Sequence, residues 1–303
     1  MLTNNITYLG KYSFELFNKA LFANDMFEHV QVFEGIKNDI TLPVLYINPV
    51  LVDDSCNFSD ARTLTMDPRV LSTCAYKMNF DLCISDIEAT FLSERMRNGT
   101  FAPVGPEELL EWVRDFGVKK IGNDVQSKFW GSTASDCLGV FGLLGGTGAT
   151  ASFATSGVIG VTAAAGVTAG NVMAELAKVY AAIPATVKSS VENDLSIWAS
   201  SDIRDAYLLA NASTTTAFFT SADRVELRYL GIPLRLINTS ATRKMVAATY
   251  DNLVLGTDLL DDKNEIRVID MRATTGDNKI RFVARVRIGQ QVRVPSDAVY
   301  YSA

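Results

Sequence analysis

The sequence predicts an α+β protein, in which helices and strands are mixed without a regular βαβ repeat. Two observations support this class. Apolar residues recur at helical spacing in three segments, 106–130, 172–183 and 201–212. From about residue 224 onward, apolar and polar residues instead alternate along short segments, as they do in strands with one buried face.

The composition is that of a folded protein of one large domain or two average ones. Of the 303 residues, 48% are apolar and 20% are charged, which argues against extended disorder. Lys and Arg number 28 and Asp and Glu number 34, so the formal net charge is −6. The chain as a whole is therefore not an electrostatic clamp for nucleic acid.

The N-terminal part of the chain reads as extended arms. Residues 1–36 are rich in Phe and Tyr, and an aromatic segment that cannot close its own core usually packs on a neighbour, often another subunit. Residues 40–50 and 70–83 read as two strands around the polar segment 51–69, which together make a projecting hairpin. Such a hairpin suits an enzyme lid or an arm that reaches a neighbouring molecule.

Capping signals mark two helices in the next segment. The capping-box spacing of Ser85 and Glu88 predicts a short helix that stops at Asn98. Pro106 suits the first position of a longer helix over 106–130. Two glycines inside this longer helix weaken it by about 1 kcal/mol each relative to Ala.

Residues 137–174 carry no charge and are rich in Gly, Ala, Ser and Thr. No stretch of about 20 residues is continuously apolar, so a transmembrane helix is not expected. The glycine-rich run 142–148 is not followed by Lys, so it is not a Walker phosphate loop. We expect a packed strand-and-loop region with close backbone approaches at the glycines. Thr168 is expected to cap the helix that follows, and residues 195–200 read as a buried strand.

The histidine and the cysteines form no catalytic or metal-binding pattern. His29, beside Glu28, is the sole histidine, which excludes a zinc cluster built on several histidines and favours a surface or interface imidazole. The chain starts with a polar segment rather than a signal peptide, so reduced thiols are expected, although an even number of cysteines also allows disulfides. The four cysteines, none of them in a CxxC pair, are Cys56, Cys74, Cys83 and Cys137.

Two charged segments lie near the C-terminus. The acidic segment lacks the spacing and the glycine of an EF-hand, so a solvated turn is favoured over a calcium site. It contains Asp258, Asp261, Asp262 and Glu265. Between residues 267 and 293, seven basic residues stand against two acidic ones, which gives this segment a net charge of +5. The basic residues are Arg267, Arg272, Lys279, Arg281, Arg285, Arg287 and Arg293, and the acidic ones are Asp270 and Asp277.

The basic segment alternates almost strictly between apolar and basic residues from Lys279 to Ile288, so the basic residues are expected on one sheet face. Such a face suits contact with nucleic acid or with carboxylates of another subunit, and a solvated sheet face explains it equally well. No aromatic residue alternates with the arginines on that face, so base stacking is not expected.

No pair of carboxylates, cluster of metal ligands, or nucleophile with an adjacent base stands out from chance in the sequence. We therefore assign no catalytic, cofactor-binding or metal-binding residue. We expect neither enzyme activity nor a cofactor.

Several C-terminal segments resemble the major capsid proteins of tailed double-stranded-DNA bacteriophages, which have the Hong Kong 97 type fold shared with encapsulin shells. The similar parts are the Gly-Ile-Pro strand in residues 228–238, the turn from Asn252 to Leu259, and the late Gly-x-Gln strand in residues 280–301. The helix, strand and helix that precede them are also similar. The resemblance covers about residues 165–301, and residues 1–164 match only in layout.

The resemblance implies a layout in which an arm and a hairpin lie across neighbouring subunits and an axial domain surrounds the symmetry axes. The expected parts are an N-terminal arm 1–36, an E-loop hairpin 37–84, a peripheral domain 85–160 with the spine helix 106–130, an axial domain 161–275, and C-terminal strands 276–303 that return to the peripheral domain. Residues 1–36 do not read as the charged scaffolding helix that begins many of these proteins. A self-crosslinking pair of Lys and Asn is not assigned.

The function implied by the resemblance is that of a structural subunit, which self-assembles as pentamers and hexamers into an icosahedral phage capsid around double-stranded DNA. Such a subunit is assembled in the host cytoplasm and belongs to the virion. Its implied partners are further copies of itself, portal, scaffolding and decoration proteins, and packaged DNA that it contacts without specificity; no membrane is involved. An encapsulin-like nanocompartment shell is the alternative, and an enzyme with a lid hairpin is a more distant one.

Overall fold

The computed structural model describes residues 6–8, 25–36, 39–47, 64–83, 106–131, 138–145, 157–189, 195–214, 227–237, 239, 241–258 and 266–302. The chain divides into two compact units, each assembled from segments that are distant in the sequence. Unit 1 comprises Met1–Lys37, Thr73–Trp130 and Leu255–Gly289, and unit 2 comprises Asn38–Ser72, Gly131–Val254 and Gln290–Ala303.

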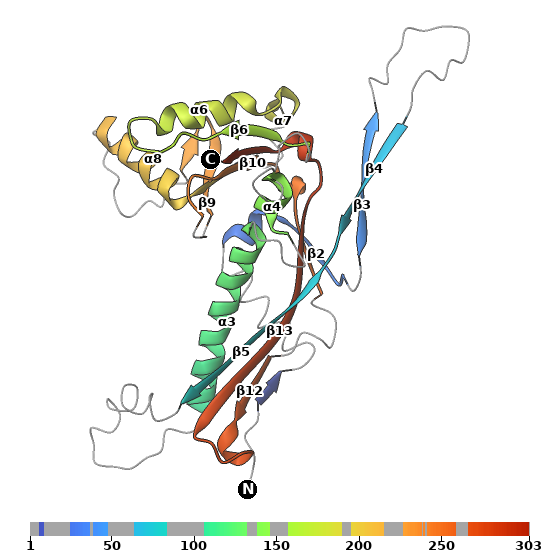
Figure 1. Ribbon diagram of the computed structural model, residues 1–303, viewed down its shortest axis with the longest axis vertical. Helices are drawn as coiled ribbons and strands as arrows, with labels where there is room; N and C mark the ends of the chain where they lie inside the picture. Colours follow the sequence, from blue (N-terminus) through green and yellow to red (C-terminus); the bar gives the residue numbers. More distant parts are fainter. Residues whose placement is uncertain are drawn as a thin grey trace. The chain divides into compact units, whose positions relative to one another are not determined.

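Unit 1 contains a long helix, α3 (Pro106–Trp130), beside a six-stranded sheet. The strand order is β1-β12-β13-β11-β2, and β5 also pairs with β13. In Figure 1, α3 runs along the part of the sheet that contains β5, β12 and β13. The strands that lie wholly or mainly in this unit are β1 (Ile6–Tyr8), β2 (Gln31–Glu34), β5 (Cys74–Cys83), β11 (Leu253–Thr257), β12 (Ile266–Asp270) and β13 (Lys279–Val292).

Aromatic side chains join α3 to the sheet. The ring of Phe80 stacks on that of Phe282 with centroids 4.9 Å apart, and it meets Phe116 edge-on at 6.1 Å. A Cβ atom at Gly117 would lie 2.5 Å from the Phe282 ring. The glycine that weakens the helix in isolation is therefore what lets α3 approach the sheet so closely. The predicted helix over 106–130 is confirmed, and its glycine is explained by packing.

The predicted hairpin exists, but its second strand is not the predicted one. β3 (Ile40–Ile47) pairs antiparallel with β4 (Leu64–Leu71), from Ile40 opposite Leu71 to Ile47 opposite Leu64. Residues 74–83 instead form β5, which pairs with β13 in unit 1. The expectation that 70–83 is the returning strand was wrong. The alternation of this segment arises because β5 packs one face against α3, and not because the segment pairs with residues 40–50.

The hairpin β3–β4 forms a two-stranded sheet of its own. Pro43 lies directly opposite Pro68 in its ladder. Neither proline has an N–H to donate, so this rung cannot be a hydrogen-bonded pair. Two prolines are tolerated here because both strands of a two-stranded sheet are edge strands.

Unit 2 contains a six-stranded mixed sheet with the order β6-β14-β10-β7-β9-β8. β14 pairs parallel with β6, and β7 pairs parallel with β9. β10 pairs antiparallel with both β14 and β7, and β8 pairs antiparallel with β9. The strands are β6 (Ile159–Thr162), β7 (Ser196–Ser200), β8 (Arg228–Tyr229), β9 (Ile232–Ile237), β10 (Met245–Ala248) and β14 (Val299–Ser302). Together with the helices of both units, this sheet confirms the α+β class.

The core of unit 2 lies between this sheet and the helices α6 (Val172–Ala182), α7 (Ala185–Ser189) and α8 (Ser201–Thr214). Figure 1 shows α6 lying along β6. Every residue of β7 is buried, as expected for the predicted strand over 195–200. The largest fully buried side chains of this core include Leu176, Ile197, Ile203 and Tyr301.

Two local predictions in unit 2 are settled by the backbone. The N-cap of α6 is Asn171 rather than Thr168, and the Oδ1 of Asn171 accepts a hydrogen bond from the Thr168 N–H at 2.7 Å. The Gly-Ile-Pro segment forms the expected edge, since β8 and β9 are joined by the two-residue turn Leu230-Gly231 at the end of the sheet. Both turn residues have positive φ, 47° and 85°, as a type I′ turn requires.

The uncharged segment contains a short helix, α4 (Val140–Gly145), where a strand or loop was predicted. The predicted close approach at glycine is present, because a Cβ atom at Gly139 would lie 2.2 Å from the Gly131 carbonyl oxygen. Among the described residues, no helix is both long enough and apolar enough to cross a membrane.

Other predictions fall partly or wholly outside the described residues. These are the helix at 85–98, most of the aromatic segment 1–36, residues 51–63 of the polar segment 51–69, and the acidic segment apart from Asp258, which is buried. The remaining residues of the polar segment, 64–69, belong to β4. Cys74 is disulfide-bonded, so the expectation of four reduced thiols was wrong, while Cys83 carries a thiol.

Candidate interaction surface

Among the described residues, no group of three or more His, Cys, Asp or Glu side chains could hold a metal ion. His29 ends the short 3-10 helix η1 (Asp25–His29) and is partly exposed, next to the exposed Glu28. This position fits the surface or interface imidazole that the sequence suggests.

The alternation along β13 separates its side chains onto two faces. Ile280, Phe282, Ala284 and Ile288 are buried, and Phe282 lies against α3. Lys279, Arg281, Val283, Arg285 and Arg287 lie on the opposite face and are exposed or partly exposed. The same division applies to β5, in which Phe80 packs on Phe282 while Lys77 and Asp81 are exposed. The predicted amphipathic strand is therefore confirmed.

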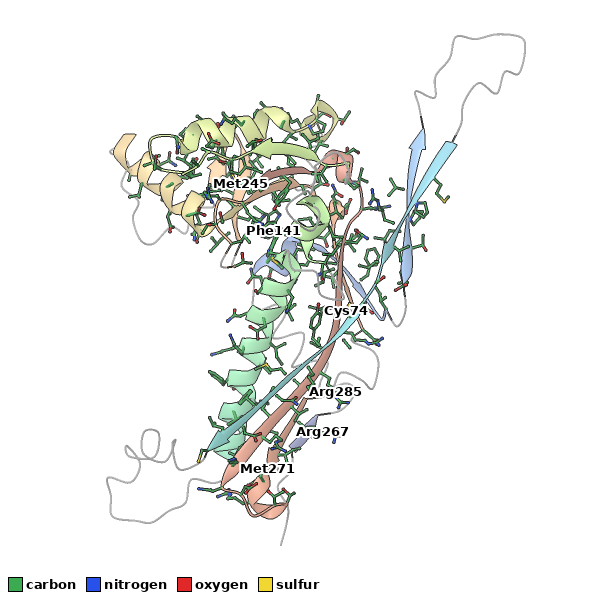
Figure 2. All side chains as sticks on the ribbon, viewed as in Figure 1. Cys74, Phe141, Met245, Arg267, Met271 and Arg285 are labelled. Atoms are coloured by element: carbon green, nitrogen blue, oxygen red, sulfur yellow. The ribbon has the colours of Figure 1, made fainter. Side chains whose placement is uncertain are left out.

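The exposed face gathers most of the predicted basic residues, and we call it the basic face. Directly opposed residues share a face, so the register of β5, β12 and β13 places their side chains together. Its charged members are Lys77, Asp81, Arg267, Lys279, Arg281, Arg285 and Arg287. Figure 2 shows Arg267 and Arg285 on neighbouring strands of this sheet.

Two of the seven predicted basic residues lie elsewhere. Arg272 belongs to the 3-10 helix η5 (Met271–Ala273), where its guanidinium binds the Asp270 carboxylate with Nη2 to Oδ2 at 2.8 Å. This contact holds the pKa of Asp270 below its ordinary value. Arg293 follows β13 in unit 2, and its backbone N–H donates to Asn252 O at 2.9 Å.

Sequence reasoning missed Lys77 and Asp81, because it assigned their strand to the hairpin. The signal that could have found them is the alternation of β5 itself, whose polar positions match those of β13. Their partners lie about two hundred residues away in the sequence, so no local pattern reveals the register.

One carboxylate is already bound on the basic face. The Nε and Nη2 of Arg281 donate to the two carboxylate oxygens of Asp81 at 2.7 and 2.8 Å. Arg281 and Asp81 are directly opposed across β13 and β5. This fork-to-fork contact lowers the pKa of the Asp81 carboxyl and raises that of the Arg281 guanidinium. The basic face can therefore hold a carboxylate by two parallel hydrogen bonds.

Two rungs further along the same face from Arg281 and Asp81, a cation faces another cation instead of a carboxylate. Lys77 lies directly opposite Arg285, and both side chains are exposed. Like charges at directly opposed positions of a sheet repel and destabilise the pair. Among the residues that the structure describes, neither forms an ion pair. This rung thus concentrates positive charge that no side chain in the described ranges neutralises.

The buried side of unit 1 carries an apolar cavity of about 190 Å³ between α3 and the sheet. Lys128 from α3 lies over the Tyr76 ring, 5.6 Å from its centroid. The principal apolar lining residues are Tyr76, Met78, Ile121, Val125, Val286 and Ile288. Its lining also includes the charged residues Lys77, Asp124 and Lys128, and Asp124 forms an exposed ion pair with Lys120 one turn away on α3. We assign no reactive role to these residues.

Unit 2 contains a buried polar cluster around the Glu175 carboxylate. Oε2 accepts a hydrogen bond from the Tyr301 hydroxyl at 2.7 Å, and Oε1 accepts one from Lys178 Nζ at 2.6 Å. Burial raises the pKa of Glu175, but the hydrogen bonds from Lys178 and Tyr301 outweigh it, so the pKa lies below its ordinary value. The cluster joins β14, near the C-terminus, to α6, which is a structural role.

No protein-family profile matches the sequence, and no curated protein sequence matches it. Solved structures do match over nearly the whole chain. The capsid of a native GTA particle, determined with C5 symmetry, is 12% identical, with a TM-score of 0.56 over 99% of this chain and 93% of that chain.

Two further structures show the same likeness. The procapsid of satellite phage P4 with its size determination protein is 11% identical, with a TM-score of 0.56 over 95% of this chain and 98% of that chain. A virus-like particle from Pyrococcus furiosus is 8% identical, with a TM-score of 0.53 over 97% of this chain and 99% of that one. The chain therefore has the fold of these shell-forming structures, the fold that the C-terminal resemblance implied.

Proposed function

We propose that this chain is the major capsid protein of a tailed double-stranded-DNA phage, a structural subunit that self-assembles as pentamers and hexamers into an icosahedral capsid. The observation that carries this proposal is the match of nearly the whole chain to assembled capsids, including a capsid with five-fold symmetry.

The proposal gives each segment a role. Residues 1–36 act as the N-terminal arm and 37–84 as the E-loop region, in which β3 and β4 are the paired strands. The resemblance assigns residues 85–160 to the peripheral domain around the spine helix, 161–275 to the axial domain, and 276–303 to strands that return to the peripheral domain. The compact units differ from these bounds, because β12 lies in the same unit as α3 and β14 lies in the sheet of unit 2. The separate two-stranded sheet of β3 and β4 supports the hairpin role, because an isolated hairpin of this kind gains stability by packing on another surface.

Assembly from many copies suits a subunit whose individual contacts are modest. Closed symmetry repeats each contact many times, so weak contacts add up to a stable shell. The proposed partners are further copies of this chain, together with portal, scaffolding and decoration proteins. Packaged DNA is contacted without sequence specificity. Assembly takes place in the host cytoplasm, and the product is the virion.

Two other functions are the alternatives to a phage capsid. An encapsulin-like compartment would use the same fold around a cargo protein, and the match to a virus-like particle from Pyrococcus furiosus supports a shell of either kind. An enzyme with the hairpin as a lid has no support from the residues that converge in the described parts of the two units. We propose that the chain is not an enzyme.

The test is to express the chain and examine it by negative-stain electron microscopy and size-exclusion chromatography. We expect shells, or isolated rings of five and six subunits, alone or after co-expression with a scaffolding protein of the same phage. Shells purified from infected cells should contain nuclease-protected double-stranded DNA. A chain that remains monomeric under all these conditions contradicts the proposal, and shells that enclose a cargo protein instead favour the encapsulin-like alternative.

A further inference from the structure

We propose that the basic face is a docking surface for carboxylates of a second copy of this chain, centred on Lys77 and Arg285. The inference rests on the proposed function, in which many identical copies assemble. To that function, the inference adds one contact between copies, with its surface, its residues and its chemistry.

The first argument is the contrast between two rungs of the same ladder. At one rung, Arg281 faces Asp81, and the fold supplies its own carboxylate in a two-pronged contact. Four residues away along each strand, Arg285 faces Lys77, where an acidic residue would have completed the same contact. A sheet that places two cations directly opposite each other accepts repulsion that a carboxylate from outside would relieve.

The second argument is the charge around this rung. Arg267 shares a rung with Val283, which lies between Arg281 and Arg285 on β13, and Arg287 lies one position beyond on the same face. Six cations and one carboxylate give the basic face a net charge of +5. Because the whole chain carries −6, the remaining residues carry −11. Each copy therefore offers both a compact positive face and an excess of acidic residues, which is the charge complementarity that copies need to bind one another.

The third argument favours carboxylates over nucleic-acid phosphates. The anion that the face already binds is a carboxylate, held between two neighbouring strands by one guanidinium. No aromatic side chain alternates with the cations, so the face has no platform for bases. An approaching duplex would also meet the −11 charge of the rest of the chain, whereas a second copy meets it with a positive face of its own.

The test is Lys77→Asp, which gives Arg285 an internal partner in the arrangement of Asp81 and Arg281. We expect the variant subunit to unfold at a higher temperature than the wild type, because a repulsive pair becomes an attractive one. We expect its association between copies to weaken by about tenfold or more, because Arg285 no longer needs an outside carboxylate. Sedimentation velocity over a concentration series, at low and high salt, measures both the loss and its salt dependence.

The matched control is Lys119→Asp, which makes the same change in net charge at an exposed position of α3. It should leave the association unchanged. A second variant, Lys77→Glu with Arg285→Glu, inverts the rung and should weaken association at least as much as Lys77→Asp. Melting curves followed by circular dichroism establish that each variant is folded before its association is measured.

The outcomes separate the inference from the proposed function. A wild type that assembles together with a Lys77→Asp variant that assembles equally well overturns the docking surface and leaves the shell function intact. A wild type that never associates overturns both. If a fluorescent 30-base-pair DNA duplex binds the wild type and Lys77→Asp abolishes that binding while assembly is unchanged, the face binds phosphates and the carboxylate assignment is wrong.

Discussion

At the level of single residues, the positions that matter most to this fold are those where two backbones or a backbone and a ring come unusually close. Gly117 illustrates the point, because the space that a Cβ atom would need is filled by the Phe282 ring. The sequence shows only that a glycine interrupts a helical pattern. Its reason is a partner 165 positions away, which no local pattern contains.

Replacement of Gly117 by Ala should therefore destabilise the subunit, although Ala is the better helix former by about 1 kcal/mol. Overpacking against the ring should cost about 1–3 kcal/mol, measured as a lower midpoint of urea unfolding at unchanged slope. Gly166→Ala is the control, since nothing lies within 4 Å of a Cβ atom at that position. A Gly117→Ala variant as stable as the wild type would show that α3 does not pack as closely as described.

At the level of elements, local signals predict helices well and long-range pairing poorly. The helix α3 starts at the predicted Pro106 and ends at the predicted Trp130, because its boundaries are set by residues inside and next to it. The alternation of β5 and β13 also predicted which of their faces are buried. The partner of β5 could not be predicted, because Cys74 pairs with Ile288, and period-two patterns carry no information on which strand lies alongside.

The same limit explains the candidate surface. The cations of β12 and β13 were visible as one basic segment, whereas the two residues that give the face its contrast, Asp81 and Lys77, come from β5. The charged residues of β5, β12 and β13 share one surface only because of the register between these strands, which the sequence does not reveal. The predicted N-cap of α6 was wrong for a different reason. Thr168 and Asn171 are both good capping residues, and only the backbone path selects between them.

The element α6 also carries a prediction on pH. The pKa of Glu175 is below its ordinary value of 4.5 in the folded protein, so its contribution to stability is present above about pH 4.5 and is lost as the pH falls through the folded value. Glu175→Gln should cost about 1–3 kcal/mol at pH 7, because the charged hydrogen bond from Lys178 is lost. The difference from wild type should shrink as the solution is acidified.

Urea unfolding of both proteins between pH 7 and pH 3 measures this difference. Asp115→Asn serves as the control, because its ion pair with Arg114 is exposed on the aspartate side and such pairs contribute little. A Glu175→Gln difference that stays constant down to pH 3 would show that the charge of Glu175 contributes nothing to the stability of unit 2.

At the level of the whole molecule, the fold and the segments outside the two cores point to assembly. The aromatic residues near the N-terminus were predicted to pack on a neighbour. Within that segment, Met26, Phe27 and Val30 are instead buried in the subunit itself, with Phe27 edge-on to Phe129 at 6.5 Å. Ile6–Tyr8 also belong to the subunit's own sheet, as the edge strand β1 paired with β12. The proposed contact between subunits therefore falls to the other residues before Asp25.

Deletion of residues 1–24 should leave a folded subunit that no longer closes into shells. The buried anchor around Phe27 is retained, so circular dichroism should show the same helix content. The deletion also removes the short edge strand β1 from β12, so the melting temperature should fall by a few degrees without loss of the fold. Electron microscopy should show open sheets, free rings or monomers. Shells of normal size and number from this deletion would remove the arm from the assembly mechanism.

The central claim is that this chain associates into rings of five and six copies. Native mass spectrometry of assembled material, dissociated gently into its building units, tests it most directly. We predict two dominant species, at five and six times the mass of the chain, in a ratio set by the geometry of the closed shell. A spectrum containing only monomers and dimers, or rings of another number, would contradict the claim that this fold serves here as an icosahedral capsid subunit.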